Sequence, residues 1–187
     1  MAIEISTERQ FRRIKKLQNA LMNLRKCTWE DLQKKTNSKS WSVIEIIDHM
    51  IIAQEVYRPK INKALNREYD SLQKKTKSKG IPAFLIKRFP PQKDKIRLKM
   101  KTSKIFRPHV SNVDLENGDG LNYIDKMDSS LRELNDWCSA SEKADLSYKF
   151  NSAIGPIVRF NVMEACEFIL CHNERHFQQI KNVLRHS

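Results

Sequence analysis

Three histidines have the spacing that metal binding requires. His172 and His176 lie four residues apart, so on a helix their imidazoles project from one face, one turn apart. Both replace apolar residues in the middle of a stripe that recurs every three or four positions. His49 falls on the apolar stripe of a second helical segment, so it too should point inward. The stripe around the pair consists of Val162, Cys166, Ile169, His172, His176, Ile180 and Val183.

Inward imidazoles are costly unless each nitrogen finds a partner. One divalent ion would satisfy His49, His172 and His176 together and leave coordination positions for water or substrate, as in catalytic rather than structural zinc sites. A single histidine on an apolar face is more often a hydrogen-bonded core residue, which is the competing interpretation. The zinc-protease interpretation of the pair fails, because Asn173 stands where that motif requires Glu.

Other polar side chains near these histidines have weaker claims. Glu45 precedes His49 by one helical turn and could support it from behind, but it is equally well placed to cap the start of the helix. Gln178 and Gln179 are interpreted as surface or packing residues. His109 and His186 receive no role.

Four helical segments must position the histidines. The first spans about residues 7–26, with Thr7 and Gln10 as its expected capping box. The second begins after Ser42, with Glu45 completing the box, and Pro59 should kink or end it. The third spans about 121–138. The fourth spans about 161–184, and its start carries another capping pattern.

The region at about 67–120 separates the second helix from the third. Gly80, Pro82, Pro90, Pro91 and Pro108 interrupt its periodicity, and scattered apolar residues indicate partial packing on the helices. A connection of this length can join parallel neighbours in a bundle. The sequence therefore predicts an all-α fold, a four-helix bundle with a long crossover between helices 2 and 3. We expect residues 1–187 to form a single domain, with a short helix near 83–88.

Two motifs resemble those of a known family. The segment Trp41-Ser-Val-Ile-Glu45-Ile-Ile-Asp-His49 resembles the Trp-Ser-x-x-Glu-x-x-x-His motif of the DinB superfamily. The segment His172-Asn-Glu-Arg-His176-Phe-Gln-Gln-Ile180 is similar to the closing His-x-x-x-His-x-x-Gln-Ile pattern of that family. The two motifs also lie near the ends of the chain where the family has them.

The resemblance implies a DinB/YfiT-like bundle in which three histidines bind zinc, nickel or a similar ion at one end. The matching positions here are His49, His172 and His176, and all three are intact. Some members of the family are S-transferases that use a low-molecular-weight thiol, and others are described as metal-dependent hydrolases. We therefore expect a metal-dependent enzyme that acts on a small-molecule substrate. The basic crossover is longer and more positive than the family pattern suggests.

The net charge of +13 is concentrated in this crossover. Residues 67–107 contain fourteen basic and three acidic side chains, and the rest of the chain is nearly balanced. The alternative function is therefore a polyanion-binding or nucleic-acid-binding module that uses this segment, with a structural metal. Against it, the segment has no nucleic-acid fold motif and no regular spacing of aromatic residues.

The cysteine content and the apolar runs of the sequence indicate where the protein is located in the cell. The four cysteines form no Cys-x-x-Cys pair, so reduced packing thiols are expected. No apolar run is long enough to cross a membrane, and the N-terminus lacks a signal-peptide pattern. We expect a cytoplasmic protein without membrane contact. Homodimerisation through helix faces suits the architecture, although no motif specifies it.

Overall fold

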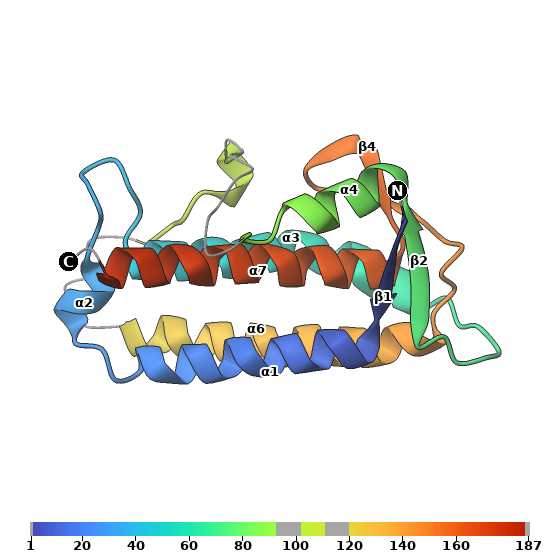
Figure 1. The fold of residues 1–187 in the computed structure, drawn as a ribbon, viewed down its shortest axis with the longest axis horizontal. Helices are drawn as coiled ribbons and strands as arrows, with labels where there is room; N and C mark the ends of the chain where they lie inside the picture. The colour runs from blue at the N-terminus through green and yellow to red at the C-terminus, as the bar shows by residue number, and fades with distance from the viewer. Residues whose placement is uncertain (1, 93–101, 111–119, 186–187) are drawn as a thin grey trace.

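Four long helices form the body of the protein. The computed structural model describes residues 2–92, 102–110 and 120–185. In Figure 1 two helices, α3 and α7, lie above the other two, α1 and α6, so that each helix has two neighbours and one diagonal partner. The predicted four-helix bundle is confirmed. The helices are α1 (Thr7–Leu24), α3 (Val43–Leu65), α6 (Gly120–Ala140) and α7 (Val162–Arg185).

The crossover between α3 and α6 joins parallel neighbours, as predicted. Figure 1 shows both helices running in the same direction. Two contacts fix their register: Gln54 donates to the carbonyl of Ser130 at 2.7 Å, and Arg58 binds Glu133 at 2.7 Å. Gln54 and Arg58 are one turn apart on α3, and their partners Ser130 and Glu133 are about one turn apart on α6 in the same direction, so the helices are parallel. Since the chain must return along the length of the bundle to restart in the same direction, a long connection is required.

Helix α3 begins as its sequence predicts but ends later. The Ser42 hydroxyl accepts from the Glu45 backbone N–H at 3.2 Å, and the Glu45 carboxylate accepts from the Ser42 N–H at 2.7 Å. The expectation that Pro59 would kink or end this helix is wrong, because α3 continues to Leu65. Pro59 faces solvent, while Tyr57 and Ile61 on either side are buried and hold the helix against the bundle.

The ends of α1 and α7 meet through polar contacts. Helix α7 starts with a reciprocal box, in which Asn161 and Glu164 accept from each other's backbone N–H at 2.8 and 3.0 Å. For α1 the predicted cap is displaced by one residue, because Ser6 accepts from Arg9. Gln10 is fully buried and instead donates to the Met163 carbonyl at 3.3 Å. Its side chain joins α1 to α7 rather than closing a turn.

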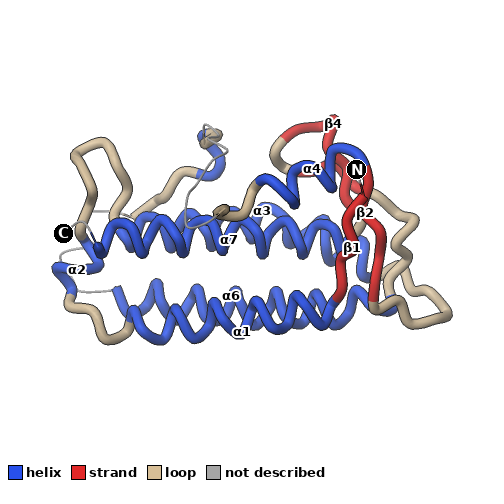
Figure 2. Tube along the Cα trace, in the orientation of Figure 1, coloured by secondary structure: helices blue, strands red, loops and turns tan. Residues whose placement is uncertain are grey.

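Two small antiparallel sheets accompany the helices, which the sequence did not reveal (Figure 2). β1 (Ala2–Ser6) pairs with β2 (Lys75–Lys79), so the N-terminus is tied to the start of the crossover. β3 (Phe150–Ser152) pairs with β4 (Gly155–Phe160) directly before α7. Within the described ranges, the short helices are α2 (Trp29–Gln33), α4 (Gly80–Arg88), η1 (Lys104–Phe106) and η2 (Ser141–Lys143).

The crossover covers the bundle beside α7. Helix α4 packs on α7, and its neighbour Phe89 is 6% exposed. Further along, Phe106 is also buried, and η1 lies against α3. The crossover thus places side chains over the helices that carry the three histidines. Among the described helices, none has the combination of length and apolar character needed to cross a membrane.

Candidate metal centre

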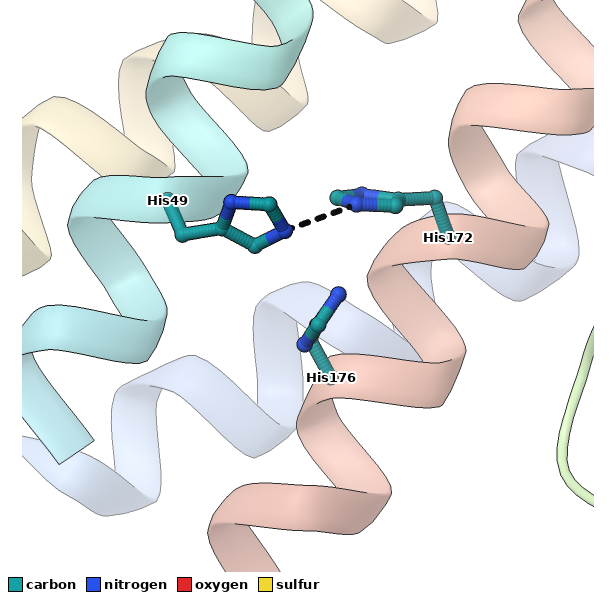
Figure 3. A group of neighbouring side chains, drawn as sticks. All are labelled: His49, His172 and His176. Atoms are coloured by element: carbon teal, nitrogen blue, oxygen red, sulfur yellow. Dashed lines mark hydrogen bonds between the residues drawn. The ribbon is translucent and has the colours of Figure 1, made fainter. Parts of the chain in front are cut away.

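The structure brings His49, His172 and His176 together between α3 and α7. One ring nitrogen of each lies within 4.8 Å of the others. The Nε2 atoms of His49 and His172 are 3.1 Å apart, and Figure 3 shows the His176 ring directed toward the space between them. His49 and His176 are 4% and 8% exposed. The predicted convergence of these three side chains is therefore present.

A backbone carbonyl from the crossover orients His49. The Nδ1 atom of His49 lies 2.5 Å from the carbonyl oxygen of Phe106. Since a carbonyl only accepts, Nδ1 carries the proton and Nε2 presents its lone pair to the other histidines. The segment that supplies this carbonyl is held to α3 by a second bond, from the His109 backbone N–H to the Asp48 carboxylate at 2.6 Å. Trp41 packs against the same imidazole, with ring centroids 4.8 Å apart.

Gln179 orients His176, contrary to the prediction that this glutamine serves only as a surface or packing residue. Its Oε1 atom lies 3.0 Å from Nδ1 of His176 and accepts the ring proton. The lone pair of His176 is then on Nε2. The i,i+3 spacing of the two residues on α7 was a usable signal, since a metal-binding histidine usually donates its other nitrogen to an oxygen.

This donor set fits a divalent ion. Two nitrogens bound to one zinc at about 2.0–2.1 Å lie roughly 3.3 Å apart in a tetrahedral arrangement. The His49–His172 separation of 3.1 Å is close to that value. Without an ion, Nε2–H of His172 donates to the Nε2 lone pair of His49; a divalent ion would replace this hydrogen bond, with the His172 proton moved to Nδ1. Imidazole ligands suit zinc and nickel, and also copper and iron.

All three histidines are kept neutral by their surroundings. Burial lowers the pKa of His49 below its ordinary value. Burial, and secondarily the neighbouring His49, lowers the pKa of His172 to about 3. Burial and the other two rings lower the pKa of His176 well below its usual range. Neutral rings are the form that binds metal, so the site is prepared for a cation at physiological pH.

These pKa shifts predict how the stability of the metal-free protein depends on pH. The pKa values of the three histidines in the folded state lie below the unfolded value of about 6.5. Below pH 6.5 the unfolded chain therefore binds protons that the folded protein does not, and the free energy of unfolding decreases as the pH falls. Each strongly shifted histidine contributes about 1.4 kcal/mol over this interval, so we expect the free energy of unfolding to fall by roughly 3–4 kcal/mol between pH 7.5 and 5.5. Urea unfolding of chelator-treated protein measures this. A His49→Gln, His172→Gln, His176→Gln variant should lose this dependence, and an equally steep profile in it would contradict the assignment.

A cavity of about 520 Å³ opens onto the histidines. Its walls come from the loop before α3, the middle of α3, the crossover, the β3–β4 turn and α7. Phe89 and Phe168 supply aromatic surface, with ring centroids 5.0 Å apart. Tyr57 also lines it, and its hydroxyl is paired with the hydroxyl of Ser152. The volume suits a small molecule rather than a polymer.

Of the two roles predicted for Glu45, support of His49 and capping of the helix start, the structure shows the capping role. Besides the Ser42 box, its carboxylate pairs with Lys35 at 2.7 Å. The Phe106 carbonyl, not Glu45, partners His49. His186 lies outside the described residues.

The basic segment is only partly described. Nine of the fourteen cations of residues 67–107 are placed, and all nine are exposed. In β2, Lys77 lies opposite Glu4 of β1, and Lys75, which lies opposite Ser6, reaches to 3.7 Å from the Glu4 carboxylate. The other five, Lys93, Lys95, Arg97, Lys99 and Lys101, lie outside the described residues.

A helical bundle with three clustered histidines beside a cavity defines a candidate metalloprotein. The profile of the DinB superfamily matches residues 10–180, and the chain belongs to this superfamily. Among solved structures, YfiT from Bacillus subtilis superposes with a TM-score of 0.58 at 12% identity, over 97% of this chain and 89% of that one. That protein is described as a probable metal-dependent hydrolase with an unusual four-helix bundle topology. Comparison with curated protein sequences gives no significant match.

Proposed function

We propose that this protein is a metal-dependent enzyme that acts on a small molecule, with His49, His172 and His176 as the metal ligands. The observation that carries the proposal is the convergence of three neutral imidazoles at the wall of a 520 Å³ cavity. The ion would be zinc or nickel, and the reaction hydrolysis or transfer of a low-molecular-weight thiol. The description of YfiT as a probable metal-dependent hydrolase supports the first of these reactions.

The cavity offers few alternatives to the ion for activating a nucleophile. No Asp or Glu side chain is among the residues that line it in the described ranges. Burial raises the pKa of Tyr57 to about 12, so its hydroxyl is not a base at neutral pH. A divalent ion held by three neutral ligands lowers the pKa of a neighbouring water or thiol and polarises a carbonyl. The protein's part is to hold the ligands, through Phe106 and Gln179, and to limit the access of water.

The proposal is tested by metal content and metal-dependent turnover together. Purified protein without an affinity tag is analysed by elemental mass spectrometry, then depleted and reloaded with zinc or nickel. Hydrolysis is assayed on p-nitrophenyl acetate, and thiol transfer on monobromobimane with cysteine. We expect stoichiometric metal and turnover that is restored by reloading.

The matched variants separate the outcomes. His49→Ala, His172→Ala, His176→Ala should lose both metal and turnover, whereas His109→Ala, which removes an exposed histidine outside the cluster, should keep both. Bound metal without dependent turnover on any substrate would contradict an enzyme and favour a structural ion. Absence of binding after reloading would contradict the site itself.

A polyanion-binding surface is the second candidate function. It is favoured by the exposure of Lys74, Lys75, Lys77 and Lys79, which follow one another along the start of the crossover. Such clusters supply salt-dependent and sequence-independent attraction. We further propose a cytoplasmic location, which the four free cysteines support.

A further inference from the structure

Arg175 is a half-buried cation with no carboxylate partner among the described residues. It lies on α7, three residues after His172 and directly before His176, and it lines the same cavity. No ion pair involves it among the described residues, and its Nη1 atom is buried without a hydrogen-bond partner. A charged nitrogen removed from water with nothing to receive its protons is costly.

The other two partly buried arginines in the described helices are paired. Arg13 binds Glu174 and Glu167, and Arg58 binds Glu133. The acid adjacent to Arg175 in the sequence is Glu174, and it is used by Arg13. The missing partner of Arg175 is therefore a local property of the cavity, not a general feature of this basic chain.

An aromatic ring fixes the guanidinium of Arg175 near the histidines. Its Cζ atom lies 5.1 Å from the ring centroid of Phe89. The other neighbour of Phe89 is His172, whose ring is nearly parallel at 6.0 Å. Stacking uses the flat face of a guanidinium and leaves the N–H groups at its edge free to donate. The cation is thus held one aromatic ring away from the metal centre.

The charge of the cavity favours an anion. Of the side chains that line it in the described part of the chain, Lys39 and Arg175 are the charged residues apart from the histidines, and both are cationic. A divalent ion at the histidines would add to this field. A guanidinium with free N–H groups in a partly dry site recognises carboxylate and phosphate groups, which accept two parallel hydrogen bonds.

We propose that Arg175 forms a binding subsite for an oxyanion group, so that the substrate or co-substrate is a small molecule with a carboxylate or phosphate at one end and its reacting group at the histidines. This rests on the proposed function for the reacting end. The subsite itself rests on the unpaired guanidinium, its stacking on Phe89 and the cationic lining of the cavity.

A matched pair of metal-binding ligands tests the proposal. Butyrohydroxamate and succinic monohydroxamate have the same length and differ in a terminal methyl or carboxylate group. Both are titrated into zinc-loaded protein by isothermal calorimetry, with the glutaric and adipic homologues to vary the reach. We expect the best carboxylate ligand to bind about tenfold or more tighter than its methyl counterpart. Phosphonate-terminated analogues show which oxyanion is preferred.

Variants assign the preference to one side chain. Arg175→Met should abolish it while leaving the zinc content and the affinity for butyrohydroxamate unchanged. Arg185→Met removes the same charge from the exposed end of α7 and should keep the preference. No preference at any chain length in the wild-type protein, or an equal preference in Arg175→Met, would overturn the subsite.

Failure of zinc loading would instead overturn the proposed function. The metal-free protein is then titrated with inorganic phosphate and with succinate. Binding that Arg175→Met removes would support the subsite without the metal, and absence of binding would overturn it as well.

Discussion

Replacing His172 by alanine is expected to lower the affinity of the protein for zinc on the order of 1,000-fold. The reason is that two imidazoles, one from α3 and one from α7, would remain where the structure gathers three nitrogens within 4.8 Å. Alanine at His49 or His176 should have an effect of similar size. Competition with a chromophoric zinc chelator at fixed pH measures each affinity.

Two further variants distinguish the metal ligands from residues that only orient them. Gln179→Leu removes the acceptor of the His176 ring proton but no ligand, so we expect a loss of roughly 10–100-fold. His109→Ala removes an exposed imidazole and should change the affinity less than twofold. If the three alanine variants bind zinc as tightly as the wild type, the ion does not lie at this cluster.

Arg13→Met is expected to reduce the free energy of unfolding by about 2–3 kcal/mol. Arg13 on α1 binds Glu174 of α7 through two bonds of 2.7 Å, and it also contacts Glu167 and the Cys171 sulfur. Burial disfavours its charge, but the hydrogen bond and charge of Glu174 leave the pKa of Arg13 above its ordinary value. Removing it leaves Glu167, with a side chain only 10% exposed, without its cation.

The adjacent arginine provides the matched control for this variant. Arg12 pairs with Glu8 at 3.6 Å on the solvent side of α1, with side-chain exposures of 65% and 81%. Arg12→Met should cost less than about 0.5 kcal/mol, because exposed pairs contribute little. Urea unfolding at pH 7.5 compares the two. Similar losses in both variants would show that the contact between α1 and α7 does not depend on this cluster.

A second variant checks the stated cause. Adding Glu167→Gln and Glu174→Gln to Arg13→Met removes the uncompensated carboxylates, so part of the lost stability should return. The cluster also sets the register of α7 against α1, because Glu167 and Glu174 lie about two turns apart and both reach the Arg13 guanidinium.

The sequence by itself determined the helices and their inward faces. Spacing of three and four placed His172 and His176 on the buried side of α7, and the structure agrees. The start of α3 at Ser42 followed from a capping box, which is a contact within one turn and needs no other element. Local periodicity is therefore enough for the bundle and for the facing of the three histidines.

The spacing of apolar residues did not predict the structure correctly where contacts with another element determine it. Leu121 fits the apolar stripe that Ile124, Leu131 and Leu134 form on α6, yet it is 53% exposed, because it lies at the first turn, where the bundle ends. Residues 2–6 alternate apolar and polar side chains at Ile3, Glu4 and Ile5, but a segment this short forms β1 only because β2 offers a partner 69 to 77 residues away. Helix α3 passes Pro59 because packing on both sides outweighs one lost hydrogen bond.

Only the tertiary structure decided what partners the polar atoms of the site. The Phe106 carbonyl that binds His49 lies 57 residues further along the chain, in the crossover. The apolar spacing of the crossover did not predict where Phe106 would lie. Arg175 and Arg13 are both arginines on inward-facing helices, yet acids meet only Arg13. The spacing of residues along one helix determines which way a side chain points. The hydrogen-bond partner of that side chain belongs to another element, so only the packing of the elements determines which residue it is.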